Sequence, residues 1–420
     1  MSQDKKEKLL WIGDSPHHSS DFGRITRELC AHLHKKFDLK VLGLYNSSYL
    51  DLGYPVIDAL EAGTGDLGMQ KAVHIINSWK PDYVVILNGP LMVGQYSSLI
   101  HQNCTHRIKV FTEKEKKENP NLPDSVVERI QETKVIGLIT LSHRIYRTDL
   151  VDILNNTLDQ AIVPTQFAVN ELTKNGFQKP IAKIRFGVNP DNFPLKPKKE
   201  SRGILGISEK AFVIYSGYRN QPEKRIDILL KGFVNFLKKH PNQEIILMMN
   251  CGVLDSGWDI PRLYQTLAKE AGITDWDLHL KLTVAQNEHP DFDDSTLALF
   301  YSAADIGVCT SHGEAWGFPT LQSAALGAPQ IVPNFAALGE LFNRGGIRIN
   351  PSDSYIEPLS TSLAMGEGQV IRANDLSQGF EIYYTNQNQL KKDSLEAKSL
   401  AKELSWKTSA EAFEAQIKKN

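Results

Sequence analysis

The sequence predicts an α/β protein of two doubly wound domains, each with a parallel sheet covered by helices on both faces. Short apolar runs alternate with polar loops and helix-length periodic segments along most of the chain, as is typical of buried parallel strands and their connecting helices. This alternation stops at a proline- and lysine-rich stretch, residues 189–200, and then starts again. The length of 420 residues also suits two or three domains of ordinary size.

The first half of the chain supplies five predicted strands and one clear helix. Each strand is a short apolar run bounded by polar residues, as expected for a strand buried on both faces. The helix covers residues 23–36, because Ile25, Leu29 and Leu33 recur at helical spacing and form one apolar face. The strands are predicted at residues 9–13, 39–44, 83–87, 136–141 and 160–163.

The second half repeats this alternation of strands and helices. Its predicted strands lie at residues 212–216, 245–249, 278–282, 306–309 and 330–332. Its predicted helices lie at residues 226–239, 260–271, 295–303 and 320–326, and a polar helix covers 393–419.

These elements predict the domain organisation. We expect a first domain at residues 1–190, a linker at 191–203, a second domain at 204–392 and a C-terminal helical segment at 393–420. Ligands of such sheets bind at the carboxyl ends of the strands. A ligand is therefore expected in a cleft between the two domains.

The composition narrows the classes of function. Lys and Arg number 47 against 49 Asp and Glu, and this near-neutral balance argues against nucleic acid as the main partner. No run approaches the 18 or so apolar residues of a membrane-spanning helix, and the charged first residues do not resemble a signal peptide. Four scattered cysteines without a C-x-x-C pair predict buried reduced thiols and no zinc site. We therefore expect a cytoplasmic protein.

The most informative segment is residues 311–329, SHGEAWGFPTLQSAALGAP, which directly follows a predicted strand. Gly313 and Gly317 flank Glu314 and permit close approach of a ligand to the backbone. Pro319 suits the first turn of a helix, whose free amides favour an anion, and Gln322 is expected to face the loop. A plain strand–turn–helix connection does not explain Glu314, Phe318 and a Trp316 that we expect to be exposed.

A second candidate segment is residues 216–227, SGYRNQPEKRID, another loop between a strand and a helix. Arg219, Lys224 and Arg225 supply forked and point-like positive charges, the combination that binds phosphates. The alternative is a charged loop that is exposed to solvent and binds no ligand. The predicted anion site within residues 311–329 makes this alternative less favoured than phosphate binding.

These residues resemble the GT-B glycosyltransferases of family 4, which are retaining and use nucleotide sugars. That family shows E-G-F-G-x-P-x-x-E, and this chain has Glu-Ala-Trp-Gly-Phe-Pro-Thr-Leu-Gln from Glu314, with Gln322 at the second acidic position. The loop with Arg219 and Lys224 is similar to N-R-x-x-x-x-K-R-x-D of viral and bacterial members. Further similarities are VPTQF at 163–167, IRFGVNPDNF at 184–193 and the Ser405-Trp406 pair near the C-terminus.

The resemblance implies a GT-B fold with a central cleft and a C-terminal helix that crosses back to the first domain. Arg219, Lys224 and the helix start near Pro319 would take the charge of the leaving diphosphate. Glu314 would orient sugar hydroxyls, Gln322 would hold the ribose, and His143 would contact the sugar. The other implied donor-binding residues are Gly217, Arg225, Gly313, Ala315, Trp316, Gly317, Phe318 and Thr320.

The first domain matches the family less closely, because the loop at residues 14–22 lacks the usual paired glycines. Asp14, His17, His18 and Asn88 are assigned to the acceptor side of the cleft. For the histidines, including His143, a solvated surface position is the alternative.

The predicted function is transfer of a sugar, with retention, from a UDP or GDP sugar to a glycan, lipid-linked or other hydroxyl acceptor. The resemblance implies no permanently bound cofactor, no metal and no protein nucleophile. The acceptor, the oligomeric state and a peripheral membrane contact are left open. The alternatives are a nucleotide-sugar-binding pseudoenzyme, suggested by Gln322, and a GT-B sugar-nucleotide epimerase.

A formal G-x-G-x-x-G match at residues 63–68, GTGDLG, suggests a third alternative, an NAD oxidoreductase. Such a site requires a strand directly before the glycines, and the preceding VIDALEA is expected to be helical or a loop. We therefore reject it as a dinucleotide site.

Overall fold

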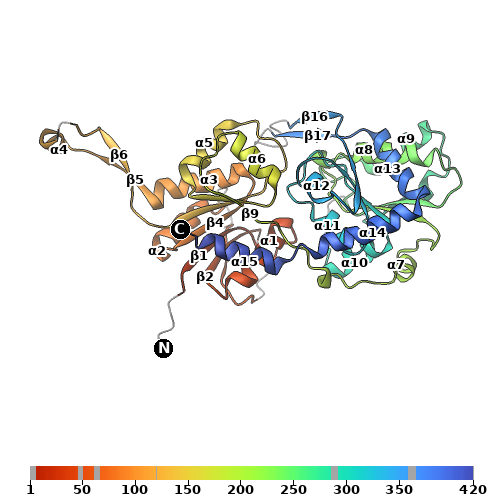
Figure 1. The fold of residues 1–420 in the computed structure, drawn as a ribbon, viewed down its shortest axis with the longest axis horizontal. Coiled ribbons are helices and arrows are strands. Elements are labelled where there is room, and N and C mark those ends of the chain that lie inside the picture. Colours follow the sequence, from red (N-terminus) through yellow and green to blue (C-terminus); the bar gives the residue numbers. More distant parts are fainter. Residues whose placement is uncertain are drawn as a thin grey trace.

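The computed structural model describes residues 6–45, 51–60, 67–119, 121–284, 292–357 and 366–419. Two α/β domains lie side by side, and an extended arm projects from the first (Figure 1). The predicted α/β class with parallel sheets is confirmed. In the described part of the chain, no helix has both the length and the apolar character needed to cross a bilayer.

The first domain contains a seven-stranded sheet in the order β3-β2-β1-β4-β7-β8-β9, within the described residues. Its strands pair in parallel, and their apolar side chains are buried on both faces. Because the strand order reverses between β1 and β4, their carboxyl ends form the switch point at which such sheets bind ligands. The strands are β1 Lys8–Asp14, β2 Asp38–Leu44, β3 Val56–Asp58, β4 Tyr83–Asn88, β7 Lys134–Ile139, β8 Gln160–Val163 and β9 Ile181–Lys183.

Helices cover both faces of this sheet. Helix α1 packs on one face, and α2, α3, α5 and α6 pack on the other. The bounds are α1 Asp21–Leu33, α2 Met69–Trp79, α3 Pro90–Ile100, the π-helical η1 His101–Thr105, α5 Thr148–Thr157 and α6 Gln166–Lys174.

The second domain repeats the architecture with a six-stranded parallel sheet in the order β12-β11-β10-β13-β14-β15, again within the described residues. Its switch point lies between β10 and β13. The strands are β10 Phe212–Ser216, β11 Ile245–Met249, β12 Leu280–Leu282, β13 Ile306–Val308, β14 Gln330–Pro333 and β15 Gly346–Ile349. The helices are α7 Lys198–Leu205, α8 Ile226–Leu237, α9 Ile260–Glu270, α10 Asp294–Ala303, α11 Phe318–Ala325, α12 Ala336–Leu341, α13 Ala373–Thr385 and α14 Gln387–Lys402, with short 3-10 turns at η2 Pro190–Asn192, η3 Pro222–Lys224 and η4 Trp276–Leu278.

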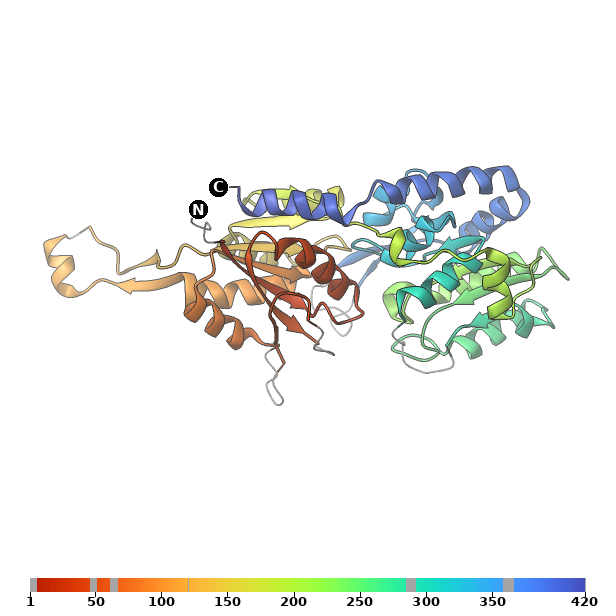
Figure 2. The same cartoon turned by 90° about the horizontal axis from the view of Figure 1, so that it is seen from below.

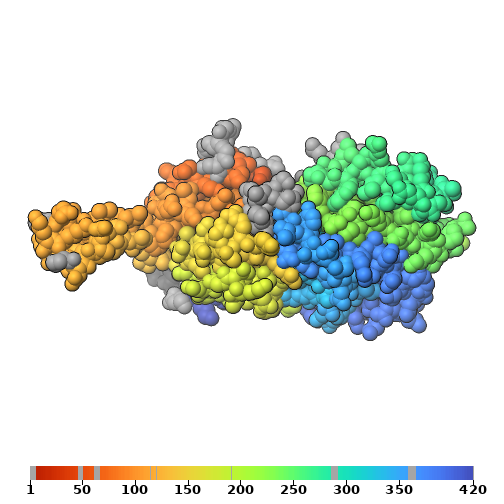
Figure 3. All heavy atoms as spheres, turned by 90° about the horizontal axis from the view of Figure 1, so that it is seen from above, coloured from red at the N-terminus to blue at the C-terminus, as the bar shows by residue number. Residues whose placement is uncertain are grey.

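Two antiparallel hairpins extend from this scaffold. The arm consists of β5 His106–Val110, α4 Glu113–Glu118 and β6 Ser125–Arg129, and it projects well beyond the body of the molecule (Figures 1 and 3). The second hairpin, β16 Asp353–Ile356 and β17 Glu367–Val370, belongs to the second domain. It touches the first domain through a bridge between Arg144 and Glu367.

The C-terminal helix α15, Trp406–Ile417, crosses back and lies along the first domain, as predicted (Figure 2). The Phe413 ring packs 5.7 Å from the Trp11 ring of β1, measured between centroids. The Ser409 hydroxyl donates to the Arg185 carbonyl at 2.7 Å. The single polar helix expected at 393–419 is instead two helices, α14 and α15, which the turn before Trp406 separates.

Two other local expectations need correction. The predicted linker contains the start of helix α7, whose buried Arg202 pairs with Asp305 at 2.7 Å and so fastens the helix to the second domain. The segment before GTGDLG is expected to be helical or a loop, but its first three residues, Val56–Asp58, form the edge strand β3. Residues 61–66, with most of that motif, lie outside the described residues.

The four cysteines are buried and free, as expected from their scattered positions. Burial raises the pKa of the Cys30 thiol well above its ordinary value, which keeps it protonated and unreactive.

Candidate functional site

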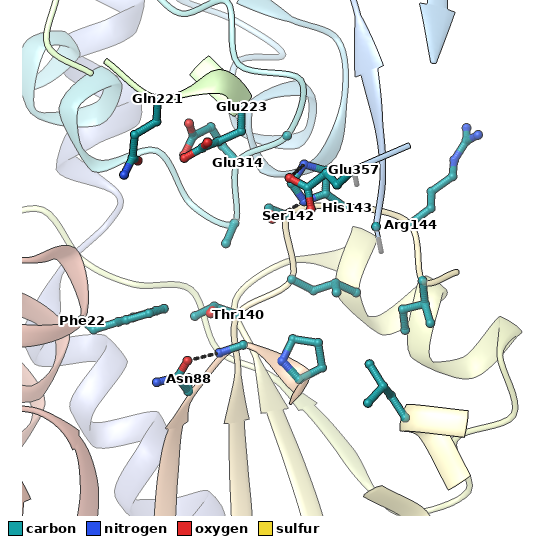
Figure 4. Close-up of a pocket in the computed structure, with 18 of the residues that line it drawn as sticks. Phe22, Asn88, Thr140, Ser142, His143, Arg144, Gln221, Glu223, Glu314 and Glu357 are labelled. Atoms are coloured by element: carbon teal, nitrogen blue, oxygen red, sulfur yellow. Dashed lines mark hydrogen bonds and ion pairs between the residues drawn. The ribbon is translucent and has the colours of Figure 1, made fainter. Parts of the chain in front are cut away.

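A cleft between the domains contains two adjoining cavities of about 710 Å³ and 630 Å³, lined by described residues. Phe22 and Thr140 of the first domain and Gln221, Lys224 and Glu314 of the second line both cavities. Figure 4 shows Phe22 and Thr140 facing Gln221 and Glu314 across the open space of the larger cavity. The cleft lies at the carboxyl ends of both sheets, where the fold predicts a ligand.

An ion pair joins the two most informative sequence segments where the cavities meet. Lys224 Nζ lies 2.8 Å from Glu314 Oε1, and the same oxygen accepts a hydrogen bond from the Ser311 hydroxyl at 2.6 Å. Burial lowers the pKa of the Lys224 ammonium, but the carboxylates of Glu314 and Glu223 outweigh this and raise the pKa overall. Lys224 is therefore a fixed cation inside the cleft.

The loop after β13 turns sharply into α11 at Gly317. The backbone of Gly317 has φ 85°, a left-handed conformation that a side chain disfavours, and Gly317 is the N-cap of α11 without a side-chain hydrogen bond. Pro319 occupies the first turn, as predicted. The first amides of α11 are thus left for another partner, and Gly317, Phe318 and Pro319 line the smaller cavity.

Arg219 and Gln322 also line the smaller cavity. The Arg219 guanidinium is half exposed and lies 3.3 Å from Asp255. Gln322 is buried, and its Oε1 accepts a hydrogen bond from the Tyr301 hydroxyl at 2.8 Å. The amide oxygen of Gln322 is therefore engaged, and its NH2 group is the part with donors to offer a ligand.

The expectation that Trp316 is exposed is wrong. Trp316 is 3% exposed, and its ring packs edge-on against Phe186 of the first domain at 5.5 Å between centroids. The loop that carries Glu314 is thus anchored across the domain boundary by an aromatic contact.

The structure brings most of the predicted donor-side residues to the cleft, with two exceptions. Arg225 lines neither cavity, because its guanidinium pairs with Asp227 at 2.9 Å. Thr320 lies beneath the surface, bonded to the Tyr218 hydroxyl. The predicted residues that line one or both cavities are Gly217, Arg219, Lys224, Gly313, Glu314, Ala315, Trp316, Gly317, Phe318, Pro319 and Gln322.

The predicted acceptor-side residues do not all line the same cavity. Asn88 lines the larger cavity, and His18 lines the smaller one with the donor-side residues. Asp14 and His17 line neither cavity. The Asp14 carboxylate is buried and accepts a hydrogen bond from the Ser20 hydroxyl at 2.5 Å, which fixes the loop that begins α1.

His143 lies on the wall of the larger cavity in contact with the second domain. Its Nε2 is 2.9 Å from Nδ1 of His312 and 3.6 Å from Oε1 of Glu357 (Figure 4 shows His143 beside Glu357). Burial, His312 and Lys224 lower the pKa of His143 to about 3, and burial, Arg225 and Lys224 lower that of His312 to about 4. Both rings are therefore neutral near pH 7, and His143 is not a solvated surface residue.

Sequence reasoning missed several residues that line the cleft or support it. Asp21 and Phe22 start α1 at the first switch point, so their position after a strand is a signal that could have found them. His312 adjoins the recognised motif, whereas Glu357 lies in a hairpin without any motif. The Asp21 side chain is exposed at the wall of the cleft, and its reduced hydration between the domains together with Glu314 raises its pKa to about 6.

Known proteins resemble this chain over part of its sequence. No protein-family model matches the chain. A D-inositol 3-phosphate glycosyltransferase of Thermobispora bispora is 31% identical over 171 residues, which make up 40% of this chain and 38% of that protein. The chain thus spans well under half the length of this curated relative.

Similarity to solved structures extends over nearly the whole chain. HepE of Anabaena, in complex with UDP and glucose, has a TM-score of 0.66 at 12% identity, covering 98% of this chain and 99% of HepE. A glycosyltransferase from Rickettsia africae has a TM-score of 0.68 at 14% identity, covering 98% of both chains. The fold is therefore that of the GT-B glycosyltransferases, two Rossmann-like domains about a central cleft, and the predicted resemblance is confirmed.

Proposed function

We propose that this chain is a retaining glycosyltransferase that moves a sugar from a nucleoside-diphosphate sugar to a hydroxyl acceptor. The observation that carries the proposal is the buried Lys224–Glu314 pair at the junction of two cavities, beside the uncapped start of α11. A cation and free amides suit a diphosphate, and a carboxylate beside them suits sugar hydroxyls. UDP is the first nucleotide to test, because the similar HepE structure contains UDP and glucose.

The smaller cavity is assigned to the nucleotide sugar. Arg219, Lys224 and the first amides of α11 would stabilise the negative charge that grows on the diphosphate as its bond to the anomeric carbon breaks. Glu314 would orient the sugar at the boundary with the larger cavity. The larger cavity, lined by Asn88 and His143, is assigned to the acceptor.

In the proposed reaction the acceptor oxygen bonds to the anomeric carbon on the face that the diphosphate leaves. The acceptor proton passes to the departing phosphate oxygen, so no protein nucleophile is required and the configuration is retained. Incubation of the purified chain with UDP- and GDP-sugars and a panel of hydroxyl acceptors tests this by release of free nucleoside diphosphate. Proton NMR of the product reports the anomer, and an inverted product would refute retention. A changed sugar nucleotide without transfer would instead indicate an epimerase.

Donor affinity should fall as the pH rises through about 6. Asp21, whose pKa is raised to about 6 by reduced hydration in the cleft and by Glu314, is neutral below that pH and negative above it. Its negative charge opposes a bound diphosphate, whose diester does not titrate in this range. The Asp21→Asn variant should bind nucleotide sugar more tightly at pH 7 and show a flat profile in calorimetric titrations between about pH 5 and pH 8. An equal slope in the variant would assign the titration to another group.

Gln322 favours a second candidate function, a protein that binds nucleotide sugar without transferring it. An amide in place of a carboxylate lacks charge assistance toward ribose hydroxyls, and here its oxygen already accepts from Tyr301. We expect Gln322→Glu to raise nucleotide affinity by about tenfold, the value of one charge-assisted hydrogen bond. Isothermal titration with UDP checks this, and unchanged or weaker binding would remove Gln322 from the ribose site. Binding without turnover for any acceptor would support the second candidate.

A further inference from the structure

Three side chains from distant parts of the sequence meet on the wall of the larger cavity. His143 follows β7 in the first domain, His312 follows β13 in the second, and Glu357 directly follows β16. Each offers one ligand atom, and these atoms lie within 4.8 Å of one another, with all three residues buried. We infer that His143, His312 and Glu357 form a site for a divalent transition metal of the zinc and cobalt class, which links the two domains.

The donor set and the spacing fit such an ion. Two imidazole nitrogens and a carboxylate oxygen suit zinc, cobalt or nickel better than calcium or magnesium. Ligands bound at about 2.0–2.2 Å in a tetrahedral arrangement lie roughly 3.2–3.6 Å apart. His143 Nε2 lies 2.9 Å from His312 Nδ1, with which it shares a hydrogen bond, and 3.6 Å from Glu357 Oε1, and the three ligand atoms lie within 4.8 Å of one another. An ion would therefore replace that hydrogen bond and draw the three ligands together.

The surroundings hold both rings in place. The Ser142 hydroxyl lies 2.7 Å from His143 Nδ1, which fixes the ring with Nε2 toward the cluster. The backbone of His312 is bonded on both sides, from its amide to the Glu223 carbonyl at 3.0 Å and from the Gln369 amide to its own carbonyl at 2.7 Å. The ligands are therefore pre-organised by elements of both domains.

Gly313 and Gly368 lie so close to the His143 and His312 rings that a side chain at either position would collide with a ring. A Cβ at Gly313 would lie 2.7 Å from His143 Nε2, and a Cβ at Gly368 would lie 2.2 Å from His312 Nδ1. Any larger residue at either position would push against a ligand nitrogen. The backbone is thus shaped to the two imidazoles at the domain boundary.

Glu357 supplies the negative charge for a bound dication, since its Oε1 lies 3.6 Å from His143 Nε2 and 3.9 Å from His312 Nε2. Two cations, Lys224 and Arg225, act electrostatically on His312. Each already pairs with a carboxylate, Lys224 with Glu314 at 2.8 Å and Arg225 with Asp227 at 2.9 Å. Their positive charge still lowers the pKa of His312 and so partly opposes a bound cation.

The three protein ligands leave a fourth position toward the cavity. His143 and Glu357 both line the 710 Å³ cavity, so the fourth ligand would be water or an oxygen atom of a molecule bound there. The site is separate from the proposed diphosphate contacts, and binding of the ion can be measured without any donor sugar.

The test is a titration of the chelator-treated chain with Co²⁺ alone. We expect one ion per chain, visible ligand-field absorption of a tetrahedral site, and a raised melting temperature when Zn²⁺ is added instead. His312→Asn and Glu357→Gln should each weaken binding at least about tenfold and abolish the thermal shift. His106→Asn is the matched control, because His106 at the base of the arm stacks on the partly buried His101 of η1 at 3.9 Å and offers a second histidine pair.

The outcomes separate this inference from the proposed function. Absence of stoichiometric Co²⁺ binding overturns it, as does binding that persists unchanged in both His312→Asn and Glu357→Gln. Loss of binding only in His106→Asn would place an adventitious ion on the arm and also overturn it. Circular dichroism establishes which variants fold, and either folded ligand variant suffices for the comparison. Sugar transfer is assayed separately, so its failure leaves the metal result intact.

Discussion

Lys224→Met should lower turnover of the nucleotide sugar by about 10²–10³-fold, the effect of removing one pre-organised group that stabilises charge in a transition state. Methionine keeps most of the side-chain length and removes the charge. Lys224 is buried at the junction of the two cavities, and the low-dielectric surroundings strengthen its attraction to a leaving diphosphate. Steady-state release of UDP measures the loss, and kcat should fall more than the affinity for UDP.

The same substitution leaves Glu314 buried without its cation, which by itself destabilises the fold. The double variant Lys224→Met/Glu314→Gln separates the two effects, because it removes both charges. We expect it to regain thermal stability and to remain inactive. Lys231→Met is the matched control and should retain full activity, because Lys231 is an exposed residue of helix α8, which begins two residues after Lys224. A single variant within threefold of the wild-type rate would exclude Lys224 from charge stabilisation.

The sheets were predictable from the sequence because their strands are buried on both faces. Strands β8, β10 and β11 coincide with the predicted residues 160–163, 212–216 and 245–249. Burial on both faces makes each strand a continuous apolar run with polar boundaries, and this signal needs no knowledge of the neighbours. The arm strand β5, His106–Val110, was missed because its residues alternate in polarity and are not buried.

The candidate site was predictable only where its residues lie within one segment. The residues from Gly313 to Gln322 were found because a loop, a helix start and a charge occur together in the sequence. The burial of Trp316 depends on Phe186, which belongs to the other domain. Likewise the contact of His143 with His312 and Glu357 arises only when the domains meet, so no local pattern contains it.

Contacts of this kind predict a role for the C-terminal helix. Trp406, the first residue of α15, stacks on Phe186 of the first domain at 6.0 Å and on Phe318 of the second at 5.9 Å. The chain passes close beneath it, since a Cβ at Gly187 would lie 2.2 Å from the Trp406 amide nitrogen. Phe318 starts α11, directly after the loop that carries Glu314. One aromatic stack therefore joins both domains to the start of the proposed diphosphate site.

Trp406→Ala should accordingly lower the free energy of unfolding by about 3–5 kcal/mol, the usual cost of removing a buried aromatic ring. Because the cavity would open beneath Phe318, we also expect weaker binding of UDP by the folded variant. Trp406→Phe should restore much of the stability and much of the UDP affinity, since a smaller ring can still stack. Chemical denaturation measures the first effect and calorimetry the second.

The matched control is Trp79→Ala, at the end of α2 in the first domain. Trp79 is half-buried, and Lys40 Nζ lies 4.3 Å from the centroid of its ring. Trp79 packs against a different hydrophobic cluster from the one that contains the aromatic stack. Its loss should reduce stability without changing UDP binding. Equal effects of the two substitutions on binding would mean that Trp406 acts only through global stability. A selective effect of Trp406→Ala would mean that the C-terminal helix positions the start of α11, and so couples the association of the two domains to the donor site.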